Sequence, residues 1–381
     1  MTCMQPHENS CCQCLPNTSA FLVRRFLNTV NSCLDPSHLG YKCNSIFPSG
    51  LDLGSCGITD DDVEAGHLQA CFQDFGTTNT TRLIMRSNRL TALPSGTFDS
   101  LQRIQTLDLS ENCLTSLPPR IFDSLEGLHH LFLAGNQLTA LPPNIFDSLH
   151  RLNQLDLQQN ELTALPPGVF DSLHRVRYLR LEMNKLASLP GGAFDSLHRL
   201  YSLWLFSNEL TTLPPGIFDS LKSLDTLHAL DNRLTVLSPG VFDSLKNLTA
   251  LNLMSNQLTM LPDRIFDSLK ALSGLSLKRN NLTTLPLGIF DPLRALTVLS
   301  LEENPYLECV PTLPPTVTIL VDDGINSKCG IHAMAHRNWS VFDGMYGVSM
   351  LSLAYIVPLL VIVSIIKRQR QRQIFRFFLR R

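Results

Sequence analysis

An asparagine recurs every 24 residues through the middle of the chain, ten times in succession without an insertion or a deletion. The first is Asn88 and the last is Asn304. Around them the sequence follows the pattern L-x-x-L-x-L-x-x-N-x-L, as at Leu131, Leu133 and Asn136, with mild departures such as Met85 and Ala229. A fixed period of this length predicts a solenoid, in which each repeat forms one coil and stacks only on its neighbours.

The positions that recur in every repeat each have a structural reason. The Leu-x-Leu pair alternates between two faces, which predicts a short strand with one buried face. The Asn side chain can bond backbone groups where the chain leaves the strand, so stacked coils form a ladder of amides. Ten residues after each Asn from Asn88 to Asn280 a Phe, such as Phe122 in Phe-Asp-Ser-Leu, fills the core. We therefore expect an α/β fold: a horseshoe-shaped solenoid with a parallel sheet on its concave face.

Changes in pattern divide the 381-residue chain into seven segments. The ten repeats occupy residues 80–304. The other segments are a cysteine-containing N-terminal segment at 1–42, an N-terminal cap at 43–79, a C-terminal cap at 305–330, a juxtamembrane linker at 331–344, an apolar segment at 345–366 and a basic tail at 367–381.

Ten of the eleven cysteines lie outside the repeats. Cysteines at both ends of a long cysteine-poor stretch indicate disulfide-stapled caps and an oxidising compartment. For the N-terminal cap we prefer a Cys43–Cys71 bridge, with Cys56–Cys71 as the alternative. A Cys309–Cys329 bridge would close the C-terminal cap. The pairing of the other cysteines stays open.

The apolar segment at 345–366 contains no charged residue. As a helix it would extend about 33 Å, enough for a hydrocarbon core of about 30 Å. We therefore predict a single transmembrane helix. The tail at 367–381 holds seven Lys and Arg residues and no acidic residue, which places it on the cytoplasmic side, near anionic lipid. The repeats then lie outside the plasma membrane, although residues 1–16 lack the apolar core of a signal peptide.

Sites for N-glycosylation favour the same topology. The sequence N-x-S/T marks an acceptor only in a chain that passes through the secretory pathway. Each match is weak alone, and a fifth one at Asn17 lies in the N-terminal segment. The predicted glycosylation sites are Asn79, Asn247, Asn281 and Asn338.

The strand positions that face solvent vary between repeats, whereas Phe-Asp-Ser-Leu hardly changes. In the middle repeats they become aromatic and basic, and exposed aromatic residues and arginines are the usual hot spots of binding interfaces. Nearby acids (Asp108, Asp156, Glu182 and Asp225) would tune specificity. We expect one contiguous ligand-binding patch on the concave face, made of His130, Phe132, Asp156, Arg177, Tyr178, Arg180, Tyr201, Trp204, Phe206, His228 and Leu230.

No pattern in the sequence indicates catalysis. There is no phosphate-binding loop, no G-x-S-x-G and no H-E-x-x-H, so we expect no enzyme, no metal and no cofactor. His332 and His336 lack the intervening Glu of a zinc protease, and Cys113 is more typical of a spare thiol than of a nucleophile. Residues 1–366 carry 24 Lys and Arg against 33 Asp and Glu, a net charge of −9. This balance argues against a nucleic-acid partner.

The repeats at 80–307 resemble the typical 24-residue leucine-rich repeats of extracellular proteins. They are similar to variable lymphocyte receptors, to Toll-like receptor ectodomains, and to membrane-anchored repeat proteins of protists and oomycetes. In variable lymphocyte receptors the concave face binds antigen, so the resemblance implies contact positions at Phe132, Asp156, Arg180, Trp204 and His228. The caps carry fewer cysteines than that family has, and no Toll-type intracellular domain follows, so the resemblance implies the architecture and not an immune role.

The sequence thus predicts a single-pass membrane protein for recognition or adhesion. Its concave face would bind a protein or a glycan, and signalling would require a co-receptor because the tail has no signalling domain. The alternative is an intracellular, membrane-anchored scaffold for protein–protein interaction, in which the repeats lie in the cytosol.

Overall fold

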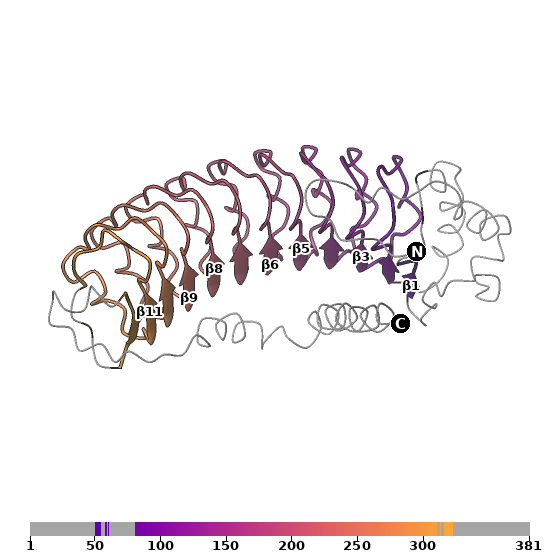
Figure 1. Ribbon diagram of the computed structural model, residues 1–381. Coiled ribbons are helices and arrows are strands. Elements are labelled where there is room, and N and C mark those ends of the chain that lie inside the picture. Colours follow the sequence, from indigo (N-terminus) through magenta and orange to yellow (C-terminus); the bar gives the residue numbers. More distant parts are fainter. Residues whose placement is uncertain are drawn as a thin grey trace, which may run out of the picture. The chain divides into compact units, whose positions relative to one another are not determined.

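The computed structural model describes residues 50–54, 58, 60, 81–310, 313 and 316–322. Within these residues the chain forms one twelve-stranded parallel sheet, and each strand pairs with the one that precedes it and the one that follows it in sequence (Figure 1). Every strand is three residues long. The strands are β1 (Gly50–Asp52), β2 (Arg82–Ile84), β3 (Thr106–Asp108), β4 (His130–Phe132), β5 (Gln154–Asp156), β6 (Tyr178–Arg180), β7 (Ser202–Trp204), β8 (Thr226–His228), β9 (Ala250–Asn252), β10 (Gly274–Ser276), β11 (Val298–Ser300) and β12 (Thr318–Leu320).

The strand register follows the 24-residue repeat. In β4 and β5 the paired residues are Leu131 and Leu155, and equivalent leucines are paired from β2 to β11. The two end strands join with other spacings, since Leu51 of β1 pairs with Leu83 and Ile319 of β12 pairs with Leu299. The sheet therefore extends past the repeats at both ends.

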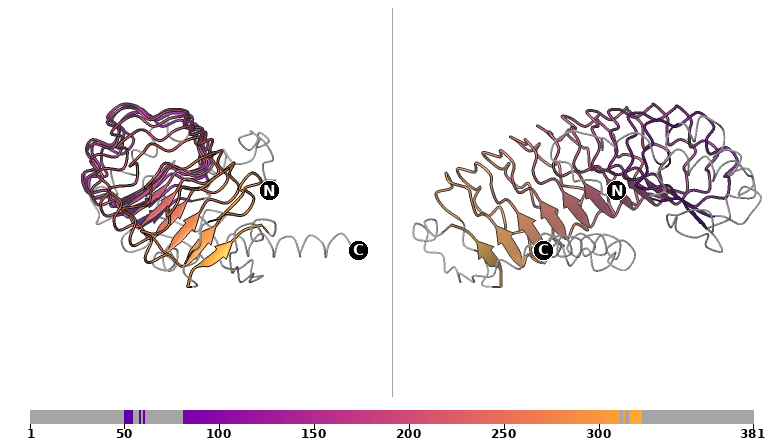
Figure 2. Two further views of the ribbon diagram at one scale, coloured as in Figure 1. Left: turned by 90° about the vertical axis from the view of Figure 1, so that its left-hand side faces the viewer. Right: turned by 45° about the vertical axis from the view of Figure 1, so that its right-hand side comes forward.

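Leucine and phenylalanine side chains fill one continuous core through the stack. The central Leu of each strand from β2 to β11 is almost fully buried, and so is the Phe of the return segment. Consecutive Phe rings, such as Phe170 and Phe194, stack with centroids 6.3 Å apart. Neighbouring strands of a sheet lie closer, about 4.8 Å apart. Because the outer side of each coil is more widely spaced than the strand side, the stack curves with the sheet on its inner side (Figure 2).

The repeating asparagines form the expected ladder of amides. Asn184 Nδ2 donates to Leu181 O in its own coil at 3.0 Å and to Leu157 O in the preceding coil at 2.9 Å. Its Oδ1 accepts from Leu162 N at 3.0 Å. The same set of bonds recurs at each of the ten asparagines from Asn88 to Asn304, with Ile58 N as the first donor to an Oδ1 atom. Each side chain thus satisfies the backbone of two coils where the chain leaves the strand.

The residue before each ladder asparagine adopts a left-handed backbone conformation. Examples are Ser255, with φ of 53°, and Met183, with φ of 56°. Only one of these ten positions is a glycine, Gly135. Left-handed φ is unfavourable for residues with a Cβ atom, so the stack imposes this conformation nine times. The sequence pattern did not reveal this turn, because glycine marks it only once.

The return segments in residues 81–310 consist of turns and irregular chain without an α-helix, so the α/β class is wrong for this part of the chain, and its regular structure is all β. Among the described residues no helix has the length and apolar character to cross a membrane. The predicted transmembrane helix at 345–366 and the basic tail lie outside the described residues.

The two cysteines in the described part of the chain, Cys113 and Cys309, are both disulfide-bonded. Cys309 forms a disulfide, but Cys329 lies outside the described residues, so their pairing stays a prediction, as does any bridge of Cys43. Cys113 is also disulfide-bonded, and the interpretation of Cys113 as a spare thiol is therefore wrong.

Candidate functional site: aromatic and arginine rows on the inner face of the sheet

Five neighbouring strands, β4 to β8, supply the side chains of the candidate site. In each three-residue strand the central Leu points into the core, so the first and third residues face outward. The residue two positions beyond the strand faces the same way. Because the register is constant, equivalent residues of successive coils lie side by side and form rows across the sheet.

One row crosses three coils at the third strand position. The guanidinium carbon of Arg180 lies 5.6 Å from the centroid of the Trp204 ring, a cation–π distance. Trp204 in turn stacks on His228, with ring centroids 6.4 Å apart and 22° between the planes. Arg180 and Trp204 remain partly exposed, whereas His228 is only 8% exposed. We call Arg180, Trp204 and His228 the central row.

A second row lies where the chain enters the strands. The guanidinium of Arg177 lies 5.9 Å from the Tyr178 ring and 5.8 Å from the Tyr201 ring. The two tyrosine rings meet edge to face, with centroids 6.1 Å apart and 73° between the planes. Burial and the neighbouring Asp225, which accepts a hydrogen bond from the phenol, raise the pKa of Tyr201. We call Arg177, Tyr178 and Tyr201 the entry row.

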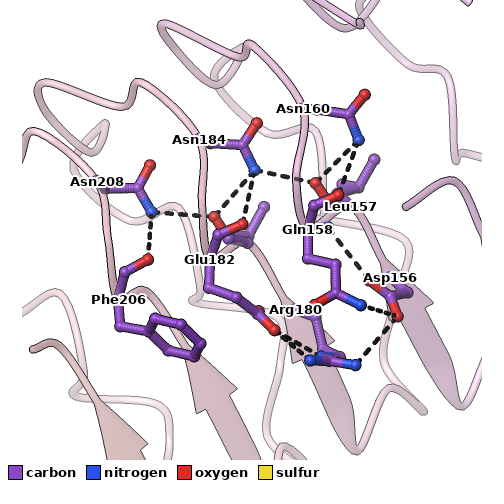
Figure 3. A network of polar contacts seen from close by, with 10 residues as sticks. Asp156, Leu157, Gln158, Asn160, Arg180, Glu182, Asn184, Phe206 and Asn208 are labelled. Carbon is purple, nitrogen blue, oxygen red and sulfur yellow. Dashed lines mark hydrogen bonds and ion pairs between the residues drawn. The ribbon is translucent and has the colours of Figure 1, made fainter. Parts of the chain in front are cut away.

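An ion-pair network underlies the central row (Figure 3). Arg180 Nε donates to Glu182 Oε1 at 2.8 Å, and Nη2 makes a shorter contact with the same oxygen. Arg180 Nη1 lies 3.4 Å from Asp156 Oδ2, which also accepts from Gln158 Nε2 at 3.3 Å. The Arg180 guanidinium thus forms ion pairs with two carboxylates, and these pairs fix its orientation against the Trp204 ring.

Burial is the largest cause of the pKa shifts of Glu182, Asp156 and His228. The Glu182 side chain has no exposed area, and burial raises its pKa to about 7 despite the opposing effect of Arg180. Among the described residues Glu182 Oε2 has no hydrogen-bond partner. Burial likewise raises the pKa of Asp156 and lowers the pKa of His228 to about 4. His228 is therefore neutral at physiological pH, which suits its stacking on Trp204.

The eleven predicted residues do not form one uniform exposed patch. Asp156, His228 and Leu230 are only 4%, 8% and 6% exposed, because the neighbouring coils cover them. His130 and Phe132 stack on each other in β4, with centroids 6.3 Å apart, and Asp156 of β5 lies between Phe132 and Arg180 in the sheet register. Three of the eleven residues are therefore poorly accessible, and a ligand-binding patch made of all eleven stays a prediction.

The accessible surface is therefore smaller than expected. It comprises the entry row, Arg180 and Trp204 of the central row, and Phe206. The Phe206 side chain is partly exposed and lies beside Glu182 of the preceding coil (Figure 3). Sequence reasoning missed Gln158, which bonds Asp156. It also treated Glu182 as an exposed acid, since nothing in a column of varying residues marks a buried carboxylate. No group of three or more metal-ligating side chains occurs within the described part of the chain.

A profile of the leucine-rich repeat family matches the chain five times, at residues 78–138, 127–186, 177–234, 198–258 and 246–305. Together these matches run from residue 78 to residue 305, more than half of the chain. The chain belongs to the leucine-rich repeat family. A search of curated proteins found no significant match.

Solved leucine-rich repeat structures are similar to this one. A leucine-rich repeat protein of Leptospira interrogans is 34% identical, with a TM-score of 0.57, over 65% of this chain and 62% of that chain. The structure of TLR13 in complex with a single-stranded RNA is 26% identical, with a TM-score of 0.59, over 68% and 42%. Drosophila Toll in complex with Spätzle is 25% identical, with a TM-score of 0.53, over 69% and 39%. This leucine-rich repeat protein thus spans less than two thirds of each of these chains and resembles Toll-like receptor ectodomains.

Proposed function

We propose that this leucine-rich repeat protein is a recognition or adhesion protein that binds a protein or a glycan on the inner face of its sheet. The fold itself implies a protein-binding role, as in the complex of Toll with Spätzle. The observation that supports this particular surface is the central row, where Arg180, Trp204 and His228 form a continuous cation–π and stacking arrangement over three coils. Arginine and aromatic side chains that are held rigid lose little entropy when a ligand binds.

Substitution of three aromatic residues tests the proposal. The full chain is screened against an array of extracellular proteins and glycans, and each ligand found is measured again with Tyr178→Ala, Trp204→Ala and Phe206→Ala combined. We expect the loss of at least about 2 kcal/mol of binding free energy, since hot-spot residues contribute that much each. A thermal melt of each protein verifies that the solenoid is folded.

The chain offers a matched control for this variant. Val236, Met260 and Leu287 are large apolar residues that are 47%, 60% and 101% exposed and lie outside the sheet. Replacement of these three by alanine removes a comparable exposed apolar surface and should leave binding unchanged. If the control variant loses the ligand as completely as the aromatic variant does, the inner face is not the binding site.

We further propose that the protein crosses the plasma membrane once through residues 345–366, with the repeats outside. The acceptor asparagines Asn247 and Asn281 are both exposed on the solenoid, which is a requirement for glycosylation. Expression in eukaryotic cells tests the topology through two measurements, the gel shift on removal of N-glycans and the access of protease to the repeats in intact cells. Repeats that are cleaved only after the cells are permeabilised would instead place the solenoid in the cytosol.

A further inference from the structure

A column of basic residues runs along the solenoid away from the inner face of the sheet. It begins directly after Phe-Asp-Ser-Leu, at the position fourteen residues past the ladder asparagine, and the next position extends it in three coils. All ten side chains are exposed. The basic column consists of His150, Arg151, His174, Arg175, His198, Arg199, Lys222, Lys246, Lys270 and Arg294.

Contacts between coils show that the column is continuous. Ser223 Oγ donates to His198 O at 3.0 Å, and Asn247 Nδ2 donates to Lys222 O at 2.9 Å. Each of these bonds joins one coil to the preceding coil at the column itself. The adjacent Phe stack repeats at about 6.3 Å, so the basic positions follow one another at a similar interval.

Each of the seven coils carries one permanent cation in this column. In the first three coils it is the Arg that follows a His, and in the last four it is Lys222, Lys246, Lys270 or Arg294. Seven fixed positive charges in a line produce a strong local potential even on a chain whose net charge is negative. The net charge of the whole chain therefore says little about this surface.

Carboxylates do not pair directly with the cations of the column. None of its ten residues forms an ion pair within the part of the chain that the structure describes. Several exposed cations elsewhere on the solenoid have carboxylate partners: Arg120 pairs with Asp123, Lys185 with Glu161, Arg233 with Glu209 and Arg264 with Asp267. The lack of partners thus distinguishes the basic column from these other cations.

The exposed Glu126 occupies the same position in the coil that precedes His150, and one Asp in each coil of the column lies three residues before that position. The Asp of each Phe-Asp-Ser-Leu folds back over the turn that precedes it. Asp195 Oδ2 lies 2.9 Å from the position that a Cβ atom on Gly192 would occupy, and Asp219 Oδ2 lies 3.0 Å from the equivalent position at Gly216. At Arg264, which replaces this glycine, the guanidinium bonds the folded-back Asp267. These carboxylates are therefore held by their own turns.

We infer that the basic column binds an anionic linear polysaccharide that runs along the solenoid. A linear polyanion can place successive negative groups against successive coils and gains free energy from the counterions that it releases. The column holds no Phe, Tyr or Trp side chain on which nucleic-acid bases would stack. It also contains none of the exposed large apolar residues, which a membrane-surface site would insert into lipid. This site is separate from the inner face and does not depend on its ligand.

Charge-removal variants of the full chain test the inference, with heparin as the probe. The column variant combines K222Q, K246Q, K270Q and R294Q. The matched control combines R120Q, K185Q, R233Q and R264Q, which removes four charges from cations that have carboxylate partners. All proteins are treated to remove N-glycans, because a glycan on Asn247 would cover the column. The basic tail at 367–381 is present in every variant, so its contribution cancels.

We expect the column variant to bind heparin at least about tenfold more weakly at 0.1 M salt, and its affinity to fall less steeply with salt concentration, because fewer counterions are released. The control should bind within twofold of the unmodified chain. Equal affinities of the two variants would overturn the site. The same measurements with polythymidine and with phosphatidylserine vesicles decide the class of ligand. If the column substitutions weaken either of these more than they weaken heparin, the polysaccharide assignment is wrong.

Discussion

Trp204 stacks on His228 of the next coil, with ring centroids 6.4 Å apart, and His228 is almost fully buried although it occupies an outward-facing strand position. On a tightly curved sheet a large side chain in one coil covers the smaller side chain of its neighbour. The inner face therefore presents the indole ring, and the imidazole supports that ring from behind.

Removal of the indole should make His228 titrate closer to its ordinary value. Burial holds the pKa of His228 at about 4, so Trp204→Ala, which admits water to the ring, should raise this pKa towards 6.5. Trp204→Phe keeps an aromatic cover and should change it less. The imidazole proton resonances, followed by NMR from pH 3 to pH 8, measure both values. An unchanged pKa in the alanine variant would mean that other groups bury His228.

Glu182 should make the solenoid less stable as pH rises. Its pKa is about 7 in the folded protein, above its ordinary value of 4.5, so the folded state binds the extra proton between these two values. Stability from this group is complete below pH 4.5 and is lost as pH rises through 7. His228, whose folded pKa is lowered, acts in the opposite direction between pH 4 and pH 6.5, so the effect of Glu182 is clearest near neutral pH.

Glu182→Gln isolates the contribution of this carboxyl group. The amide keeps the shape of the side chain and carries no charge, so the variant should gain stability relative to the unmodified chain as pH rises from 5 to 7.5. The expected change in this difference is roughly 1–3 kcal/mol. Urea unfolding at the two pH values measures it. A difference between the two proteins that does not vary with pH would show that Glu182 is already ionised at pH 5.

Most of the fold could be predicted from the sequence because one period fixes it. The strands, the buried leucines, the Phe stack and the amide ladder all follow from residues that recur every 24 positions. The conformation of the return segments could not be predicted as well, because both turns and a helix can bury the Phe. The positions that vary gave the least information, because the exposure of Asp156 or His228 depends on the side chain that the next coil happens to carry.

Asn184 should be among the least replaceable polar residues of the repeats. Its Nδ2 donates to two carbonyl groups in the core, and its Oδ1 accepts one backbone N–H. Asn184→Asp exchanges the donor for an oxygen that faces both carbonyls, which should cost about 2–5 kcal/mol of unfolding free energy. Exposed Asn281→Asp is the matched control and should have little effect. Chemical denaturation compares the two, and similar stabilities would contradict a structural role for the ladder.

The left-handed residue before each ladder asparagine offers a way to stabilise the solenoid. Ser255 has φ of 53°, a conformation that costs a residue with a Cβ atom about 1–2 kcal/mol. Glycine adopts it freely but loses more entropy on folding, so Ser255→Gly should raise the unfolding free energy by a net ~0.5–1 kcal/mol. Gly135 already occupies the equivalent position, so the stack accepts this residue.

Ser255→Val, which adds a branched Cβ in the same conformation, should destabilise instead. Denaturant midpoints of the two variants give the comparison, and a glycine variant less stable than the valine variant would show that backbone strain does not limit stability at this turn.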